Sequence, residues 1–192
     1  MHPKALGQSL FYDLTQDLRL ILSYEGRAFT LKNIAWGLLA CDAYAVLASF
    51  RLRMWARKYH IPLLNRILRF AQTAFYAIEL GNGIQLGHGV YFVHTVGTVI
   101  GGDARIGEGC VFMGNNTVGA ARFQGSPEIG AYTVLGAGVR ALGRIRVGAH
   151  CFLGANAVVV DDIPDGHLAV GIPARAHPQT ETLISGQIAA QF

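Results

Sequence analysis

Between residues 79 and 163, aliphatic or aromatic side chains recur at every sixth position, and most are followed directly by glycine. Neither the 3.6-residue period of a helix nor the two-residue alternation of a strand produces this spacing. The anchor positions are Leu80, Leu86, Phe92, Ile100, Ile106, Phe112, Val118, Ile129, Leu135, Ala141, Val147, Leu153 and Val159. A fixed short period is typical of a solenoid, in which each repeat buries its apolar residue against its neighbours. The sequence therefore predicts stacked coils of short strands joined by tight corners.

A second set of mostly small residues lies four positions after the anchors, and we expect these residues to point into the same core. They are Ile84, Val90, Ala104, Cys110, Asn116, Thr133, Val139, Ile145, Cys151, Ala157 and Ile163. This placement makes Cys110 and Cys151 core residues rather than nucleophiles. It also predicts that Asn116 is hydrogen-bonded within the stack. The three cysteines of the chain have no metal-ligand or redox spacing, which favours a reducing compartment.

The first part of the chain has few glycines and many helix formers. The expected helices span residues 9–26, 30–60 and 62–79. Thr30 is suited to cap the second helix, Gly26 to end the first, and Pro62 to open the third. The predicted buried face of the third helix consists of Leu64, Ile67, Leu68, Ala71, Phe75 and Ile78, with Arg66, Arg69 and Gln72 turned away. The chain is thus predicted to be α+β, with a helical region (1–78), a left-handed β-helix domain (79–176) and a C-terminal tail (177–192).

The positive charge of the chain is concentrated in the helical region. Residues 1–78 hold ten Lys and Arg against four Asp and Glu, whereas residues 79–192 hold six against eight. In the segment 51–70, the basic residues Arg51, Arg53, Arg57, Lys58, Arg66 and Arg69 alternate with apolar ones. Such a segment could lie on an anionic membrane, each cation contributing about 1 kcal/mol near the surface. A helical cap with a solvated basic face explains it slightly better, and both interpretations stay open. No nucleic-acid-binding module is recognisable.

Two breaks in the six-residue period mark candidate functional segments. The step from Phe92 to Ile100 is eight residues, so two extra residues bulge out of the coil at His94. The step from Val118 to Ile129 is eleven, so residues 119–128 leave the solenoid as a loop. Departures from a repeat are where function usually lies.

The segments around these breaks resemble a known family. "VHTVGTVIGGDARIGEGCVFMGNNTVG" (93–119) and "DIPDGHLAVGIPAR" (162–175) are similar to the hexapeptide-repeat acyltransferases, most of all to their serine acetyltransferase branch. The resemblance implies a left-handed parallel β-helix that assembles as a homotrimer in the cytoplasm. It also implies an enzyme that transfers an acyl group to a hydroxyl, with acetyl-CoA as co-substrate and no metal.

The resemblance assigns the catalytic histidine to His94 and its paired carboxylate to Glu79, where the family usually has Asp. The chemistry agrees, because a neutral imidazole is a good general base for an alcohol that attacks a thioester near pH 7. A carboxylate on the far ring nitrogen fixes the tautomer and stabilises the imidazolium that forms. Small-residue corners let backbone amides approach the pantetheine arm and pyrophosphate of the co-substrate. The cofactor-binding residues expected from the resemblance are Gly119, Ala120, Gly136, Ala137, Gly154, Ala155, Gly171 and Arg175.

A metal site is the competing interpretation of the histidines. "GHGVYFVH" (87–94) is superficially similar to the γ-class carbonic anhydrases, which bind zinc on the same solenoid through three histidines. A catalytic zinc needs at least three protein ligands, and no histidine lies between His60 and His88 to complete the set. We therefore expect His88 to be a corner residue and no metal to be bound.

The acceptor is predicted from what the loop lacks. In the serine-specific branch the loop carries Arg-His before a proline, and the arginine holds the carboxylate of the amino acid. Here Gly125 and Ser126 stand at those positions, and Val93 replaces an acidic residue suited to an ammonium group. Arg122 in the same loop could substitute. We therefore expect the acceptor to be a sugar hydroxyl of a surface or exported polysaccharide. Serine is the alternative, and a non-catalytic trimeric scaffold or binding module is a second one.

Overall fold

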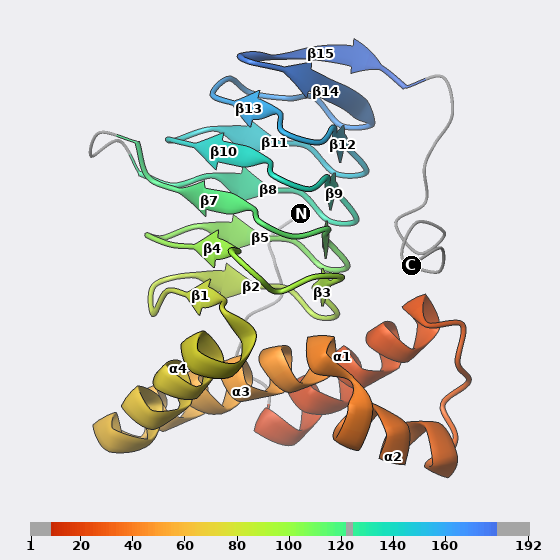
Figure 1. The fold of residues 1–192 in the computed structure, drawn as a ribbon, viewed down its shortest axis with the longest axis vertical. Coiled ribbons are helices and arrows are strands. Elements are labelled where there is room, and N and C mark those ends of the chain that lie inside the picture. The colour runs from red at the N-terminus through yellow and green to blue at the C-terminus, as the bar shows by residue number, and fades with distance from the viewer. Residues whose placement is uncertain (1–8, 122–124, 180–192) are drawn as a thin grey trace.

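A computed structural model describes residues 9–121 and 125–179, which form a layer of four helices beneath a parallel β-solenoid (Figure 1). The helices are α1 (Leu10–Tyr24), α2 (Leu31–Ala40), α3 (Asp42–Lys58) and α4 (Pro62–Tyr76). Ser9 caps α1, Thr30 caps α2 as predicted, and Pro62 opens α4 as predicted. Arg122 and almost all of the predicted C-terminal tail lie outside the described residues.

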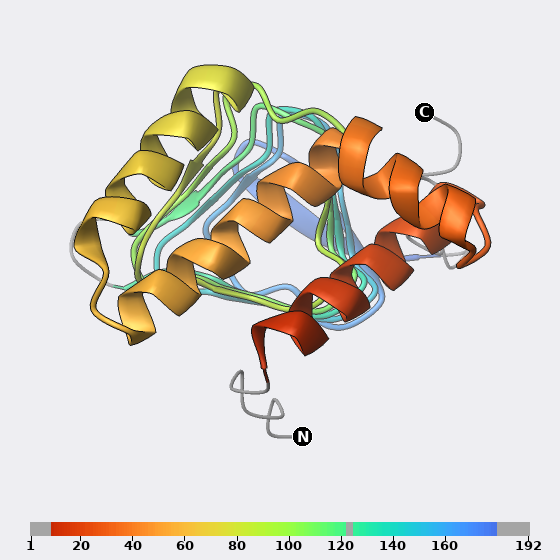
Figure 2. The ribbon, with the colours of Figure 1, turned by 90° about the horizontal axis from the view of Figure 1, so that it is seen from below.

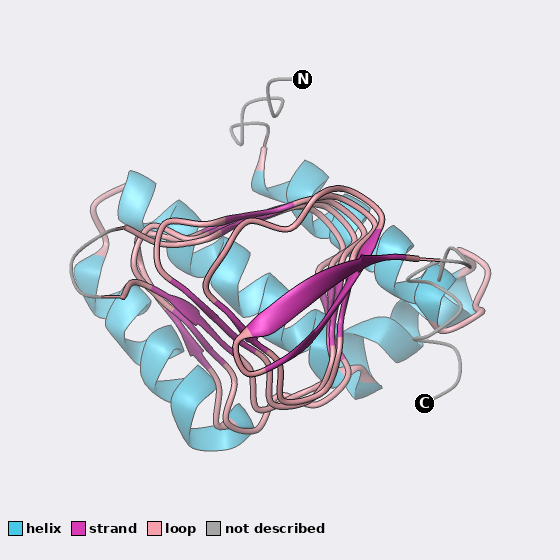
Figure 3. Cartoon of the chain, turned by 90° about the horizontal axis from the view of Figure 1, so that it is seen from above, coloured by secondary structure: helices cyan, strands magenta, loops and turns pink. Residues whose placement is uncertain are grey.

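The solenoid has three faces, each a sheet of short strands, and it is triangular when viewed along its axis (Figures 2 and 3). Sheet 1 contains β1 (Glu79–Leu80), β4 (Val99–Ile100), β7 (Thr117–Gly119), β10 (Arg140–Leu142) and β13 (Val158–Val159). Sheet 2 contains β2 (Gln85–Leu86), β5 (Arg105–Ile106), β8 (Glu128–Ile129) and β11 (Arg146–Val147). Sheet 3 contains β3 (Tyr91–Phe92), β6 (Val111–Phe112), β9 (Val134–Leu135), β12 (Phe152–Leu153), β14 (His167–Gly171) and β15 (Ala174–Pro178). Among the strands of the described residues, only β15 pairs antiparallel, and it closes the top as a hairpin with β14.

The six-residue period of the sequence corresponds to one short strand and one corner of the solenoid. Leu80 pairs with Ile100, and Ile100 pairs with Val118, so every third anchor along the chain stacks on the same face of the solenoid. Every predicted anchor is at most 4% exposed, and every residue of the second inward set is buried. Asn116 donates from Nδ2 to the Gly136 carbonyl and accepts at Oδ1 from the Gly114 amide. The predicted core of this region is confirmed.

The single helix expected over residues 30–60 is wrong. The chain leaves the helical conformation at Cys41 (φ −102°, ψ 104°), and α2 and α3 meet there at a bend of 78°. The break lets α3 run beneath the solenoid, where Val46, Leu47 and Phe50 are at most 1% exposed. Within the described chain, no single helix is long and apolar enough to cross a membrane. Taken together, the bent pair α2–α3 has the length and apolar composition of a membrane span, and this rests on length and composition alone.

The buried face predicted for α4 is also wrong. Ile67 and Phe75 are 54% and 82% exposed, whereas Gln72, expected to face solvent, is 1% exposed. The cause lies on α3, whose Arg53 is completely buried. A buried guanidinium must be hydrogen-bonded, and Arg53 donates to Gln72 Oε1, the Leu80 carbonyl and Asn82 Oδ1. Gln72 donates in turn to the Val46 carbonyl and Ser49 Oγ. The polar side of α4 is therefore held inward.

A second buried arginine fastens the helices to the first coil. Arg51 pairs with Asp17 (Nε to Oδ2, 2.8 Å) and donates to the Leu86 and Gly87 carbonyls. Asp17 also accepts from the Gly89 amide. Arg51 and Arg53, expected to belong to a basic surface segment, are thus interior residues that contact the solenoid.

Candidate active site

His94 lies in the bulge between β3 and β4, at the edge where sheet 3 passes into sheet 1. Its side chain is exposed and packs close to the next coil up. A Cβ atom on Gly114 would stand 2.9 Å from His94 Cβ, and Gly114 has φ +120°, so both space and backbone conformation require glycine there. Gly114 therefore positions His94, a role that the six-residue pattern did not reveal.

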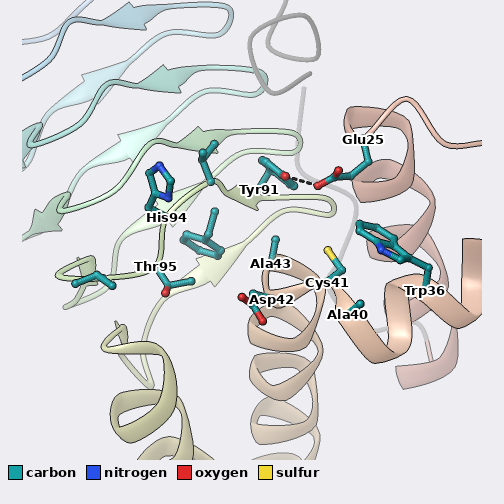
Figure 4. A pocket seen from close by; sticks show the side chains of 12 residues that line it. Glu25, Trp36, Ala40, Cys41, Asp42, Ala43, Tyr91, His94 and Thr95 are labelled. Carbon is teal, nitrogen blue, oxygen red and sulfur yellow. Dashed lines mark hydrogen bonds between the residues drawn. The ribbon is translucent and has the colours of Figure 1, made fainter. Parts of the chain in front are cut away.

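The side chain of His94 borders a pocket of about 250 Å³ between the bulge and the helices (Figure 4). The other lining residues that matter for its chemistry are Glu25, Trp36, Cys41, Asp42, Tyr91 and Thr95. Among the residues that the structure describes, none forms a hydrogen bond with the His94 ring. The imidazole is therefore available to an incoming group.

Two carboxylates make this pocket acidic, and both come from helix ends. Glu25 follows the last residue of α1 and accepts a hydrogen bond from the Tyr91 hydroxyl (2.5 Å). Asp42 is the first residue of α3. The region before residue 79 has only two other acidic side chains, Asp13 and Asp17. Asp17 pairs with Arg51 and Asp13 with His88, where the helices contact the solenoid. Burial raises the pKa of the Tyr91 phenol and of the Cys41 thiol, so both stay protonated at neutral pH. Sequence reasoning missed the carboxylates of this pocket.

Glu79 begins β1 near the same edge of the solenoid, one coil below His94. Its carboxylate accepts from Arg69 on α4 (2.7 Å), and the two side chains are 49% and 47% exposed. An exposed pair of this kind is worth only about 0–1 kcal/mol, so it can exchange partners readily. The pairing of Glu79 with His94 stays a prediction.

Several predicted cofactor-binding corners form a column above His94. Residues 136–138 and 154–156 occupy the same sheet 3 to sheet 1 edge, on successive coils. Backbone hydrogen bonds join the corners directly, from the Gly138 amide to the Gly114 carbonyl and from the Asn156 amide to the Ala137 carbonyl. Gly171 and Arg175 belong to the closing hairpin, and Arg175 approaches Asp161 at 3.5 Å.

The remaining predicted residues lie at a different edge. Gly119 and Ala120 stand where sheet 1 passes into sheet 2, across the face from His94. Ser126 at the base of the loop is 7% exposed, and its hydroxyl accepts from the Asp103 amide. Within one chain, therefore, the described part of the substrate loop is not brought to His94.

The other histidine of the segment "GHGVYFVH" (87–94) has a structural role. His88 Nε2 lies 3.0 Å from Asp13 Oδ1, and its ring packs edge-on against Tyr12. In residues 9–121 and 125–179, no three His, Cys, Asp or Glu side chains gather in a way that could hold a metal ion.

Hexapeptide coils with an exposed histidine in a corner bulge define the class of the protein, a β-helix acyltransferase. Comparison with known proteins identifies the family. The chain is 30% identical to the serine acetyltransferase of Synechococcus elongatus over 169 residues, covering 86% of this chain and 68% of that protein. It is 32% identical to that of Helicobacter pylori strain J99 over 166 residues, covering 85% and 95%. Soybean serine acetyltransferase has the same fold, with a TM-score of 0.78, 26% identity, and coverage of 89% and 70%. No family model matches the sequence.

The chain belongs to the serine acetyltransferase family. It is an acetyl-CoA-dependent O-acetyltransferase. The predicted fold class, helices followed by a hexapeptide β-helix, is confirmed by the structure and by this similarity. The likeness expected to polysaccharide-modifying enzymes has no support among these relatives.

Proposed function

We propose that the protein transfers the acetyl group of acetyl-CoA to the hydroxyl of serine, with His94 as the general base. This acceptor replaces the sugar as our first choice. The names of the curated relatives support it, and one observation on this chain carries it. The pocket that borders His94 contains the carboxylates of Glu25 and Asp42. Two negative groups in the pocket that His94 borders favour an acceptor with an ammonium group near its hydroxyl.

In the proposed reaction, His94 removes the hydroxyl proton while the acceptor oxygen attacks the thioester carbonyl. When the tetrahedral intermediate breaks its C–S bond, the imidazolium returns the proton to the departing CoA thiolate, and protons and charge balance. Glu79 would stabilise the imidazolium after exchanging Arg69 for His94. The column of small corners above His94 would receive the pantetheine arm, because the exposed side chains of Ala137 and Ala155 are small.

A sugar hydroxyl remains the second candidate, because of one specific feature. The described lining of the pocket contains no lysine or arginine that could hold a carboxylate. Gly125 and Ser126 offer none either, and the Ser126 hydroxyl is already engaged by the Asp103 amide. A neutral acceptor on a surface or exported polysaccharide would need neither charge.

An acceptor series that changes one charge at a time separates the two candidates. CoA release is followed with serine, with serine methyl ester, which keeps the ammonium group, and with N-acetylserine, which keeps only the carboxylate. Neutral sugars and glycan fragments complete the panel. Serine and its ester should be used well and N-acetylserine poorly. A neutral sugar that turns over as fast as serine would reject the serine assignment and favour the second candidate.

Two further expectations are proposals of the same kind. We propose a homotrimer with the domain limits 1–78, 79–176 and 177–192. Arg51 and Arg53 are buried against the solenoid and cannot contact a membrane surface. We therefore do not propose membrane contact through residues 51–70.

A further inference from the structure

The base of the 119–128 loop borders a second concavity, a groove of about 520 Å³ on the outer side of sheet 2. The charged side chains that line it are Asp103, Arg105, Glu128, Arg144, Arg146 and Asp162. All three carboxylates have hydrogen-bond partners. Glu128 accepts from Arg105 (3.1 Å), Asp162 accepts from the Arg146 backbone amide (2.7 Å), and a hydrogen bond from the Ser126 hydroxyl lowers the pKa of Asp103. Within residues 9–121 and 125–179, the guanidinium groups of Arg144 and Arg146 donate no hydrogen bond.

Arg144 is held against the base of the loop. It lies between two buried residues, Gly143 and Ile145, in the corner that joins β10 to β11. The Gly143 amide donates to the Gly119 carbonyl (2.9 Å), which fixes this corner to the start of the loop. A Cβ atom on Gly125 would stand 3.7, 3.8 and 3.9 Å from Cβ, Cγ and Cδ of Arg144. A side chain at position 125 would therefore lie along the stem of Arg144.

We propose that Arg144 binds the carboxylate of the acceptor, in a site completed by His94 of a neighbouring copy. The proposal rests on serine as the acceptor and deepens that function by naming the missing cation. The resemblance assigns the cation to position 125, where this chain has glycine. Arg144 brings a guanidinium to the same part of the loop from the next coil, and its free N–H groups suit two parallel bonds to a carboxylate.

The groove and the pocket that borders His94 lie on the two faces beside sheet 1. The pocket takes residues from β3 of sheet 3, and the groove takes residues from β5, β8 and β11 of sheet 2. In the proposed homotrimer, with sheet 1 of each copy toward the symmetry axis, sheet 2 of one copy faces sheet 3 of the next. The cleft between copies then has Glu25 and Asp42 on one wall and Arg144 on the other. Serine carries an ammonium group for the first wall and a carboxylate for the second.

Steady-state kinetics with serine and with serine methyl ester tests the role of Arg144. Arg144→Gln should raise KM for serine about 10- to 100-fold, because a charge-assisted hydrogen bond to the carboxylate is lost. KM for the ester, which has no carboxylate, should not rise, and Arg144→Lys should recover part of the loss for serine. Arg146→Gln is the matched control, because it removes the same charge from the same coil but from β11 on the face of sheet 2. Its KM values should equal those of wild type.

A mixture of two variants tests whether the site spans two copies. His94→Ala and Arg144→Gln are co-expressed with different affinity tags, and assemblies that carry both tags are purified. In any mixed ring of three, one interface joins an intact His94 to an intact Arg144. The mixed assembly should therefore turn over serine at a low concentration that neither variant uses alone. If both residues acted within one chain, mixing would restore nothing.

The outcomes separate this proposal from the proposed function. An unchanged KM for serine in Arg144→Gln, or an equal rise for serine and its ester, overturns the role of Arg144 and leaves serine as the acceptor. An equal effect of Arg146→Gln overturns it too, because the groove would then act only through its overall charge. Mixed assemblies without recovered turnover overturn the shared site. A wild type that uses a neutral sugar and not serine rejects the proposed function and this proposal together. Circular dichroism confirms that each variant is folded.

Discussion

The solenoid and the helical layer are stabilised in different ways. The solenoid interior is almost entirely apolar, and its few polar side chains, such as Asn116 and Thr133, bond to carbonyls of adjacent coils. Each coil depends only on its neighbours, so stability is spread along the stack. The helical layer instead buries charged groups, Arg51 with Asp17 and Arg53 with Gln72. These contacts join segments far apart in sequence. Single polar substitutions should therefore be much more damaging below the solenoid than on it.

Asp17→Ala should have the largest effect on stability. The substitution leaves the Arg51 guanidinium buried without its partner, and breaking a buried pair in this way costs about 3–5 kcal/mol. Urea unfolding monitored by circular dichroism measures the loss. Glu128→Ala is the matched control on the solenoid, because its pair with Arg105 is 57% exposed on both sides. That variant should lose at most about 1 kcal/mol. Similar losses in the two would contradict the comparison.

His94→Ala should have the largest effect on catalysis without affecting stability. Loss of a general base lowers kcat at least about 10²-fold. The side chain is exposed and makes no hydrogen bond with the described residues, so unfolding in urea should be unchanged. CoA affinity, measured by calorimetry, should also be kept. Near wild-type turnover of the preferred acceptor by this variant would reject the mechanism.

Asp42→Asn tests the contribution of the helical layer to the active site. If the carboxylate holds the ammonium group of serine, the variant loses a charge-assisted hydrogen bond worth about 1.5–3 kcal/mol. We expect KM for serine to rise about 10- to 100-fold, while KM for acetyl-CoA stays constant. Steady-state kinetics with both substrates varied measures this. An equal rise in the two KM values would indicate a general distortion instead.

The packing of the solenoid was predictable from the sequence and the packing of the helices was not, for the same physical reason. Ile100 and Val118 stack three six-residue repeats apart, so the sequence itself contains their environment. The face of α4 is set by Arg53, which lies on another helix and forces Gln72 inward. An amphipathic pattern reports which side of a helix is apolar, and not which side is covered.

The residues of the candidate active site differ in the same way. His94 interrupts the period and could be found from the sequence. Glu25 and Asp42 reach it only through the packing of α1 and α3. One signal was available in the sequence: residues 1–78 contain only four acidic side chains, which makes each of them a candidate for a specific contact or for the site.

Gly114→Ala should have an intermediate effect, located at the contact between two coils. The added Cβ would lie 2.9 Å from His94 Cβ, in a backbone conformation at φ +120° that costs about 1–3 kcal/mol for other residues. We expect a measurable loss of stability and a clear fall in kcat as His94 is displaced. Gly101→Ala is the control, because nothing lies within 4 Å of its added Cβ. Equal behaviour of the two variants would remove the positioning role of Gly114.

The smallest effects are expected for Arg69→Gln. This substitution removes the ion pair between α4 and the first coil of the solenoid. Arg69 and Glu79 are each about half exposed, so their ion pair contributes at most about 1 kcal/mol to stability. In the proposed mechanism, Glu79 must leave Arg69 to support His94, so Arg69→Gln should keep or raise kcat. Glu79→Gln should lower kcat, by less than His94→Ala, at nearly unchanged stability. If both variants lower kcat equally, the ion pair itself is what the site needs. Glu79 would then be a junction residue rather than the partner of His94.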